Sequence, residues 1–484
     1  MTEPNQVLPV PPADLPATLG ALRAAGHHYR TVKQELRDNL LARLRAGGDR
    51  FPGIVGYDDT VLPEVERALL AGHDMVLLGE RGQGKTRLIR SLVALLDEWT
   101  PVIAGSVLNE HPMHPLTPAS RALAAEAGDD LPVAWLHRSM RYGEKLATPD
   151  TSVGDLIGDV DPIRIAQGRT LGDPETIHFG LVPRTNRGIF AVNELPDLAE
   201  RIQVALLNVL EERDIQVRGY QLRLPLDLLL VASANPEDYT NRGRIITPLK
   251  DRFGAEIHTH YPLGLELELA LIRQEADLVA DVPEHVLEVL ARFARAVRDS
   301  PSVDQRSGVS ARFAIAAAET VAAAALRRSG LLAAGATTDG VREEAPVARV
   351  GDAVSVTSTL RGKVEFESGE DGREVEILAH LLRTATADTF RARLAGLDLS
   401  GFTALVDDGR VVETGELVAS ADLLRQVGTV PGLAKALDRL GLGDAPTPEQ
   451  AAAGVEFVLE GLHLTRRLGK DVTDSGRTVY GGRG

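Results

Sequence analysis

The residues with the clearest chemical potential lie in a glycine-rich stretch, "LLGERGQGKTRL". Within it, Gly79, Gly84, Lys85 and Thr86 have the spacing GxxxxGK[ST]. Glycines let backbone N–H groups curl around phosphate oxygens, the lysine reaches the terminal phosphates, and the threonine hydroxyl is a ligand for Mg²⁺. The stretch also stands between a buried strand and an amphipathic helix, so it predicts a site for ATP and Mg²⁺. The residues expected to line this site are Gly79, Glu80, Arg81, Gly82, Gln83, Gly84, Lys85, Thr86 and Arg87.

A second stretch, "GIFAVNELPD" at residues 188–197, has the pattern of a buried strand that ends in Asn193-Glu194. Glu194 is placed to polarise an attacking water. Asn193 stands where a carboxylate normally holds a metal-bound water, and its amide oxygen accepts a hydrogen bond without carrying full charge. We therefore expect Mg²⁺ held near Thr86, Asn193 and Glu194 to bind more weakly, and Asn193→Asp to lower the Mg²⁺ requirement. The alternative is a plain strand-to-helix turn.

Three further residues are candidates for catalysis beside Glu194. Asn235 ends a third buried run, "LLLVASAN", where a neutral donor could contact the γ-phosphate; the alternative is an Asn-Pro turn. Arg252 in "PLKDRFG" could stabilise transition-state charge on a neighbour's ATP; the alternative is a surface ion pair. Arg312 in "SGVSARFAI" stands near a helix start, from which an arginine could close a lid onto phosphate.

The elements that must position these residues alternate along the chain. Buried strands are predicted for "DMVLLG", "GIFAV" and "LLLVASAN", and a β-hairpin around Gly219-Tyr220. Helical spacing is found over residues 30–46, 63–71, 85–99 and 198–213, and the chain is mainly helical from 264 to at least 330. Strands that alternate with helices predict an α/β fold with an open, mostly parallel sheet.

Composition narrows the class of protein. The 484 residues suffice for two or three domains, and the net charge of −16 argues against a general nucleic-acid binder. The chain has no cysteine, which excludes disulfides and thiolate metal sites and fits the cytoplasm. We find no signal peptide and no apolar run long enough for membrane insertion. In "NEHPMHPL", prolines keep His111 and His114 off a helix, so a surface loop is expected rather than a metal site.

Taken in order, these stretches resemble an AAA+ ATPase of the helix-2-insert clade, close to MoxR-type ATPases and the I (ATPase) subunit of magnesium chelatase. "FPGIVGYDD" resembles the entry motif that lines the adenine pocket, which assigns Val55 and Gly56 to that pocket. The block from "TSVGDLIGDV" to "NELPDL" resembles the inserted segment before the metal strand. "LKDRFG" and "VSARF" resemble the arginine-finger and sensor-2 segments. The resemblance covers about residues 50 to 330, and Asn193 in place of Asp departs from it.

The resemblance implies a P-loop AAA+ domain with a parallel sheet and a pre-sensor-1 β-hairpin, followed by a helical lid. It also implies a homo-oligomeric ring, commonly a hexamer, and a separate partner with a von Willebrand A domain. The expected domains are a lead-in and helix at 1–48, the ATPase core at 49–263, the lid at 264–400 with a linker near 333–349, and a helical extension with a flexible tail at 401–484.

The leading function is a Mg²⁺-dependent, ATP-hydrolysing motor that remodels a client or drives metal insertion together with a partner. The expected client is a protein or a metallo-cofactor enzyme. One alternative is the magnesium chelatase ATPase subunit proper, which inserts Mg²⁺ into a porphyrin. Another is an ATP-gated scaffold that hydrolyses little because Asn193 weakens metal binding. A DNA helicase or loader is disfavoured by the acidic charge.

Overall fold

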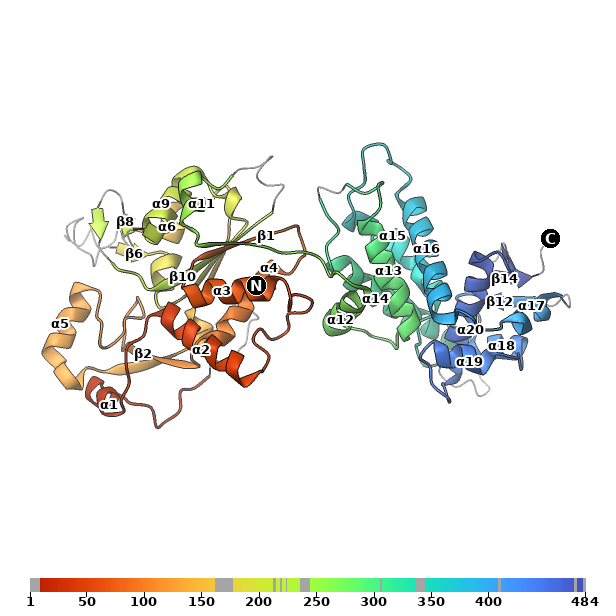
Figure 1. Ribbon diagram of the computed structural model, residues 1–484, viewed down its shortest axis with the longest axis horizontal. Helices are drawn as coiled ribbons and strands as arrows, with labels where there is room; N and C mark the ends of the chain where they lie inside the picture. The colour runs from red at the N-terminus through yellow and green to blue at the C-terminus, as the bar shows by residue number, and fades with distance from the viewer. Residues whose placement is uncertain are drawn as a thin grey trace. The chain divides into compact units, whose positions relative to one another are not determined.

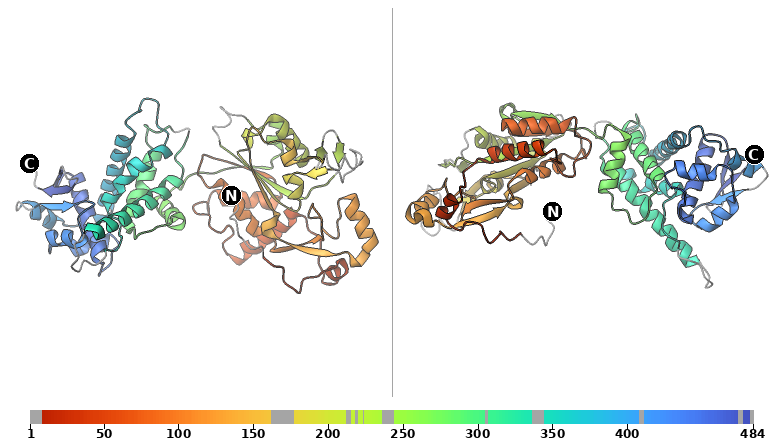
Figure 2. Two further views of the ribbon diagram at one scale, coloured as in Figure 1. Left: turned by 180° about the vertical axis from the view of Figure 1, so that it is seen from behind. Right: turned by 60° about the horizontal axis from the view of Figure 1, so that its bottom comes forward.

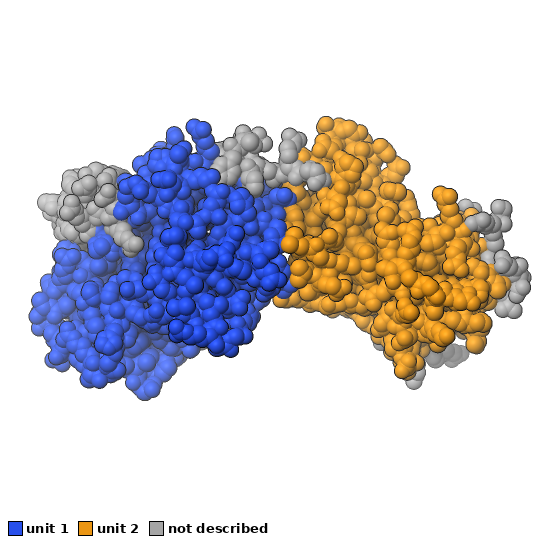
Figure 3. Space-filling view, viewed as in Figure 1, with its two compact units in different colours: residues 1–260 blue, residues 261–484 orange. Residues whose placement is uncertain are grey.

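The computed structural model divides the chain into two compact units, Met1–His260 and Tyr261–Gly484 (Figure 3). No helix in the part of the chain that it describes is long and apolar enough to cross a membrane. The described residues are 9–161, 177–211, 215–217, 220–222, 224–235, 244–304, 307–335, 344–407, 411–473 and 477–481.

The first unit is built on a five-stranded sheet in the order β11-β1-β10-β7-β4, and every neighbouring pair is parallel. The central strands are continuous apolar runs because both faces of the sheet are covered. This confirms the predicted α/β fold. Two strands, β4 and β11, were not predicted from the sequence. The strands are β1 (Met75–Leu78), β4 (Tyr142–Leu146), β7 (Gly188–Asn193), β10 (Leu228–Ala234) and β11 (Ala255–His258).

Helices cover both faces of this sheet (Figure 1). On one face α2 (Val32–Ala46), α3 (Val61–Ala71) and α4 (Lys85–Ser91) share a hydrophobic core with the strands. On the other face α9 (Glu200–Glu211) and α11 (Thr247–Arg252) do the same. The helix expected over 85–99 is shorter than predicted, because it tightens into a 3₁₀ turn at Leu92–Leu95 and Trp99 already begins a strand.

Smaller elements surround the sheet of the first unit. The predicted hairpin is confirmed as the antiparallel pair β8 and β9. Two more antiparallel pairs are β2 with β3 and β5 with β6. These elements are β2 (Trp99–Ile103), β3 (Val133–His137), β5 (Gly158–Val160), β6 (Ile177–Phe179), β8 (Ile215–Val217), β9 (Tyr220–Leu222), α1 (Leu19–Ala24), α5 (Pro118–Ala127), α6 (Val153–Leu156) and α8 (Leu181–Arg184).

The second unit is mainly helical (Figure 2). Within it, α13 packs against α14 and α16. A small antiparallel sheet in the order β12-β14-β13 completes it. A flexible tail was predicted here, but Thr478–Gly481 instead forms β14 and pairs with both other strands. The elements are α12 (Leu265–Glu275), α13 (Glu284–Arg298), α14 (Arg312–Gly335), α15 (Val354–Thr359), α16 (Glu374–Leu394), α17 (Ser400–Asp407), α18 (Ser420–Val427), α19 (Leu433–Arg439), α20 (Pro448–Leu464), β12 (Val412–Thr414), β13 (Gly469–Val472) and β14 (Thr478–Gly481).

One hydrophobic core extends through the second unit. Phe293 of α13, Phe390 of α16 and Phe457 of α20 all belong to it. Residues on both sides of position 400 therefore share a single core, although the sequence predicts a lid and a separate extension there.

Candidate functional site

The glycine-rich loop joins the end of β1 to the start of α4. Gly82 and Gly84 have φ values of +74° and +82°, a left-handed conformation that favours glycine. Gly79 is required for a different reason. A Cβ atom there would lie 2.0 Å from Thr259 Oγ1 and 2.2 Å from Gln83 Oε1. The structure thus requires glycine at Gly79 and Gly84, two positions of the sequence motif.

Lys85 is buried, and its ammonium group lies at the carboxyl ends of β1 and β10. Its Nζ donates hydrogen bonds to the carbonyl oxygens of Gly79 and Glu80 and to Asn235 Oδ1, the last at 2.8 Å. Two residues 150 positions apart in the sequence, both predicted for the nucleotide site, are therefore in direct contact.

β7, the strand predicted to carry a Mg²⁺ ligand, ends beside β10, and side-chain oxygen atoms gather at its end. Asn193 Oδ1 accepts hydrogen bonds from Ser233 Oγ at 3.0 Å and from Thr86 Oγ1 at 3.4 Å. Hydroxyl and amide oxygens are ligands of the kind that Mg²⁺ prefers. These three side chains therefore fit a Mg²⁺ ion that also binds phosphate.

Glu194 follows in a left-handed conformation, with φ 56° and ψ 48°. For a residue with a side chain this costs about 1–3 kcal/mol and is found most often at functional sites. Glu194 is half-buried, and its backbone N–H donates to Ser233 Oγ at 3.4 Å.

A residue that sequence reasoning missed, Glu144 on β4, lies against Asn193. Glu144 Oε1 accepts from Asn193 Nδ2 at 2.6 Å, and Arg90 of α4 donates to both carboxylate oxygens at 2.9 and 3.0 Å. Tyr142 Oη donates to Oε2 at 3.0 Å. Burial raises the pKa of Glu144, but the hydrogen bonds from Arg90 and Tyr142 outweigh it and leave this pKa below its usual value.

The entry segment is anchored on the loop by Tyr57. Its hydroxyl donates to the carbonyl oxygens of Gln83 and His260, and burial raises its pKa to about 12. Arg87 Nε donates to the carbonyl of Gly53 at 2.9 Å, which ties α4 to the same segment. Val55 and Gly56 are half-buried between these two anchors. Their place in an adenine pocket stays a prediction.

Comparison with known proteins finds magnesium-chelatase subunits among the relatives of this chain. The family model "Sigma-54 interaction domain" matches residues 170–252. The magnesium-chelatase subunit ChlI of Nostoc sp. is 30% identical over 235 residues, which cover 47% of this chain and 59% of that protein. The magnesium-chelatase 38 kDa subunit of Cereibacter sphaeroides is 29% identical over 240 residues, which cover 48% and 64% respectively.

The chain belongs to the AAA+ family and is related to the I subunits of magnesium chelatase. It spans about three fifths of the length of these curated relatives. Among solved structures, a complex between subunits BchI and BchD of magnesium chelatase matches at 24% identity over 68% of this chain and 98% of that one, with a TM-score of 0.35. The assignment rests on the sequence matches.

The two predicted arginines of this AAA+ protein take no part in the loop contacts given above. Arg252 is exposed near the end of α11 and forms an ion pair with Glu211 of α9. Arg312 is exposed at the first residue of α14, in the second unit. No role toward nucleotide follows from either position, and both assignments stay predictions.

The surface loop predicted for the two histidines is confirmed for His114, which is exposed in a turn, and is wrong for His111. His111 is 1% exposed, its ring stacks on His27, and their Nε2 atoms are 3.2 Å apart. Burial and the positive charge of Arg187 lower the pKa of His111 to about 2. Across the described residues, no cluster of three or more His, Cys, Asp or Glu could hold a metal ion. His111 is therefore a neutral, packed side chain.

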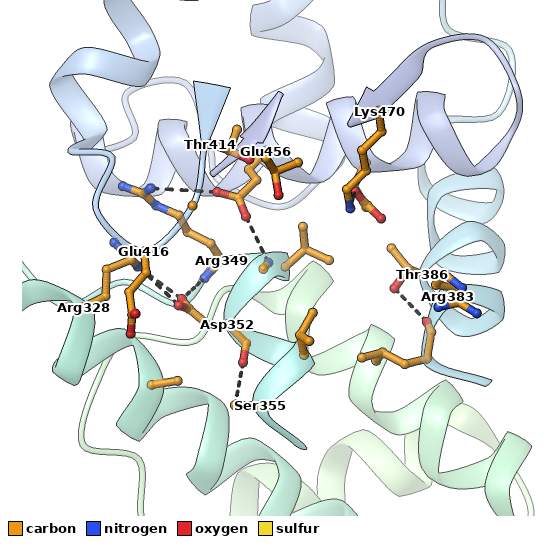
Figure 4. Close-up of a pocket in the computed structure, with 18 of the residues that line it drawn as sticks. Arg328, Arg349, Asp352, Ser355, Arg383, Thr386, Thr414, Glu416, Glu456 and Lys470 are labelled. Atoms are coloured by element: carbon orange, nitrogen blue, oxygen red, sulfur yellow. Dashed lines mark hydrogen bonds and ion pairs between the residues drawn. The ribbon is translucent and has the colours of Figure 1, made fainter. Parts of the chain in front are cut away.

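The second unit contains a cavity of about 480 Å³ lined by α14, α16, α20 and β14 (Figure 4). Charged side chains of its lining pair with one another, as Arg328 does with Asp352 at 3.2 Å and Lys470 with Glu460 at 2.7 Å. Burial raises the pKa of Glu456, which lies 3.8 Å from Arg349. The charged side chains that line this cavity thus form a network of ion pairs.

Proposed function

We propose that this AAA+ protein is a Mg²⁺-dependent ATPase motor. One observation carries the proposal. The residues predicted to bind phosphate and those predicted to bind Mg²⁺ lie together at the carboxyl ends of β1, β10 and β7. Lys85 contacts Asn235 there, and Thr86 contacts Asn193. In open α/β sheets, ligands bind in the crevice at this end of the strands.

The side chains that would hold the nucleotide follow from their chemistry. Lys85 is the cation for the β- and γ-phosphates, and its present acceptors are carbonyl and amide oxygens that phosphate oxygens can replace. Thr86, Asn193 and Ser233 would hold Mg²⁺, which supplies charge neutralisation on the transferring phosphate.

Hydrolysis then needs a base and an orienting group. Glu194 accepts a proton from water while the water oxygen forms a bond to the γ-phosphorus. The bond from that phosphorus to the bridging oxygen breaks, and its electron pair leaves with ADP. Asn235 hydrogen-bonds the γ-phosphate without adding charge, so the attacking water and the phosphate stay aligned.

The motor function requires assembly, which we propose on the resemblance. Arg252 would complete the site of a neighbouring subunit in a homo-oligomeric ring, and Arg312 would report the bound phosphate to the helical unit. The relatives named as magnesium-chelatase subunits support a partner protein and a role in metal insertion, whereas client remodelling rests on the resemblance alone.

Hydrolysis of ATP by the native chain tests the proposal, with and without Mg²⁺ and with size analysis in each nucleotide state. We expect slow Mg²⁺-dependent turnover, an ATP-bound ring for Glu194→Gln, and no nucleotide binding for Lys85→Ala. Unchanged ATP binding by Lys85→Ala would overturn the site assignment.

A scaffold that binds ATP but hydrolyses little remains the second candidate, because Asn193 lacks the charge of a carboxylate. Equal inactivity of the native chain and Glu194→Gln, with ATP bound to both, would favour it. The chelatase role is tested separately, by Mg²⁺ insertion into a porphyrin when the chain is mixed with the other subunits of a chelatase.

A further inference from the structure

The amide of Asn193 has a defined orientation, which its neighbours dictate. Glu144 carries a carboxylate that only accepts hydrogen bonds, so the group facing it at 2.6 Å must be Nδ2. The amide oxygen then faces the hydroxyls of Ser233 and Thr86. Glu144 thus presents the oxygen of Asn193 to the side where the metal ligands gather.

The sheet register explains why Glu144 reaches this position. In the parallel pair β4 and β7, Glu144 is opposite Ala191, so the two side chains lie on one face of the sheet. Asn193 is two residues beyond Ala191 and shares that face. Arg90 of α4 approaches from the same side, because α4 covers this face.

We propose that Glu144 is a positioning residue that supplies the negative charge missing from Asn193. The inference rests on the proposed function and concerns the same Mg²⁺ site. A carboxylate that accepts from the amide N–H polarises the amide, and this increases negative charge on the oxygen at the other end. Asn193 thus supplies the oxygen ligand and Glu144 supplies the negative charge, and one hydrogen bond joins the two side chains.

This geometry changes the expectation for Asn193→Asp. An aspartate oxygen in place of Nδ2 would stand against Glu144 Oε1, and two ionised carboxylates in contact repel each other. The single substitution therefore should not strengthen Mg²⁺ binding. The gain should appear only when Glu144→Gln is added, because that pair exchanges the charged and the neutral group.

A substitution of Arg90 provides a control with the opposite expected effect on Mg²⁺ binding. Its guanidinium neutralises Glu144 from the solvent side, where the arginine side chain is 59% exposed. Arg90→Gln removes that counter-charge and leaves the carboxylate in place. It should therefore strengthen Mg²⁺ binding, whereas Glu144→Gln should weaken it.

The test measures ATP affinity of the full chain by calorimetry in Mg²⁺ and in EDTA, and takes the ratio of the two dissociation constants. Glu144→Gln should lower the Mg²⁺-dependent gain in affinity by about fivefold to tenfold, and Arg90→Gln should raise it. Asn193→Asp alone should not exceed the native gain, and the double variant should recover it or exceed it.

Three results would overturn the inference. They are an equal loss of ATP affinity with and without Mg²⁺ for Glu144→Gln, additive effects of Asn193→Asp and Glu144→Gln in the double variant, or no effect of Arg90→Gln. Failure of the proposed function looks different: a wrong nucleotide site would leave the native chain without ATP binding in either buffer, and a scaffold would bind ATP in Mg²⁺ without hydrolysing it. Circular dichroism spectra confirm that each variant is folded before the ratios are compared.

Discussion

At the scale of single residues, side-chain contacts hold the glycine-rich loop of this protein in one conformation. Lys85 is bonded to two loop carbonyls and to Asn235, and Tyr57 closes on the carbonyl of Gln83. The loop conformation is thus stabilised by the protein itself, which lowers the entropy cost of binding a phosphate chain.

Gly79→Ala is predicted to destabilise the first unit by about 1–3 kcal/mol, because its methyl group would overlap Thr259 and Gln83. Urea denaturation of the native chain and the variant measures the difference. Gly48→Ala is the matched control, since a Cβ there meets no atom within 4 Å and the position belongs to the same unit. Equal stability of both variants would contradict the packing argument.

At the scale of elements, a buried ion pair ties α2 to the residue before β4. Arg141 is 0% exposed and donates to both oxygens of Glu35 at 2.6 Å. Glu35 Oε1 also accepts from the backbone N–H of Asp97 at 2.7 Å. This contact ties the edge strand that carries Glu144 to α2, so a buried ion pair outside the loop supports the proposed metal site.

Replacing Glu35 with Gln should cost about 3 kcal/mol, because it leaves the buried Arg141 without its counter-charge. The unfolding free energy of the first unit in urea reports this loss. The exposed pair of Arg23 and Asp129 provides the comparison, and Asp129→Asn should change stability by less than about 1 kcal/mol. A loss for Glu35→Gln no larger than this control would show that the pair is dispensable.

A buried histidine in α13 makes the second unit sensitive to acid. His285 is 0% exposed, and burial lowers its pKa to about 3. Near pH 6, His285 therefore takes up no proton in the native state but does so in the unfolded state. Its contribution to the free energy of unfolding is full above pH 6.5 and falls as the pH decreases.

The predicted loss from His285 is about 1.4 kcal/mol between pH 7.5 and 5.5. His285→Leu should remove this part of the pH dependence, which is read from unfolding curves at the two pH values. The same pH dependence in the native chain and the variant would show that His285 does not titrate between the two states.

At the scale of the whole molecule, the two units have separate hydrophobic cores. The cores of the first unit contain residues up to Ile257, and the core of the second begins at Leu269. Each unit therefore buries its own apolar surface, which is the physical requirement for folding alone.

A fragment of residues 261–484 is predicted to fold independently with one cooperative unfolding transition, measured by circular dichroism. A fragment that stops at residue 400 should not, because it loses Phe457 and its neighbours from the shared core. Cooperative folding of the shorter fragment would instead support the sequence-based division at 400/401.

Local patterns in the sequence were sufficient for much of the fold. The loop, the strands β1, β7 and β10, and the hairpin were predicted because phosphate binding and burial require particular residue types at short spacing. Helix ends were less predictable. The helix after the loop tightens at Leu92–Leu95 without a proline or glycine to mark it.

By itself the sequence determined the family, the parallel sheet and the position of Asn193 at the end of a buried strand. Only the tertiary structure placed Glu144 against that asparagine, 49 residues away. The reason is physical: strand register and the helix that covers the sheet decide which side chains meet, and neither can be derived from local spacing. The missing charge at Asn193 is a property of the sequence, whereas its proposed replacement depends on the fold.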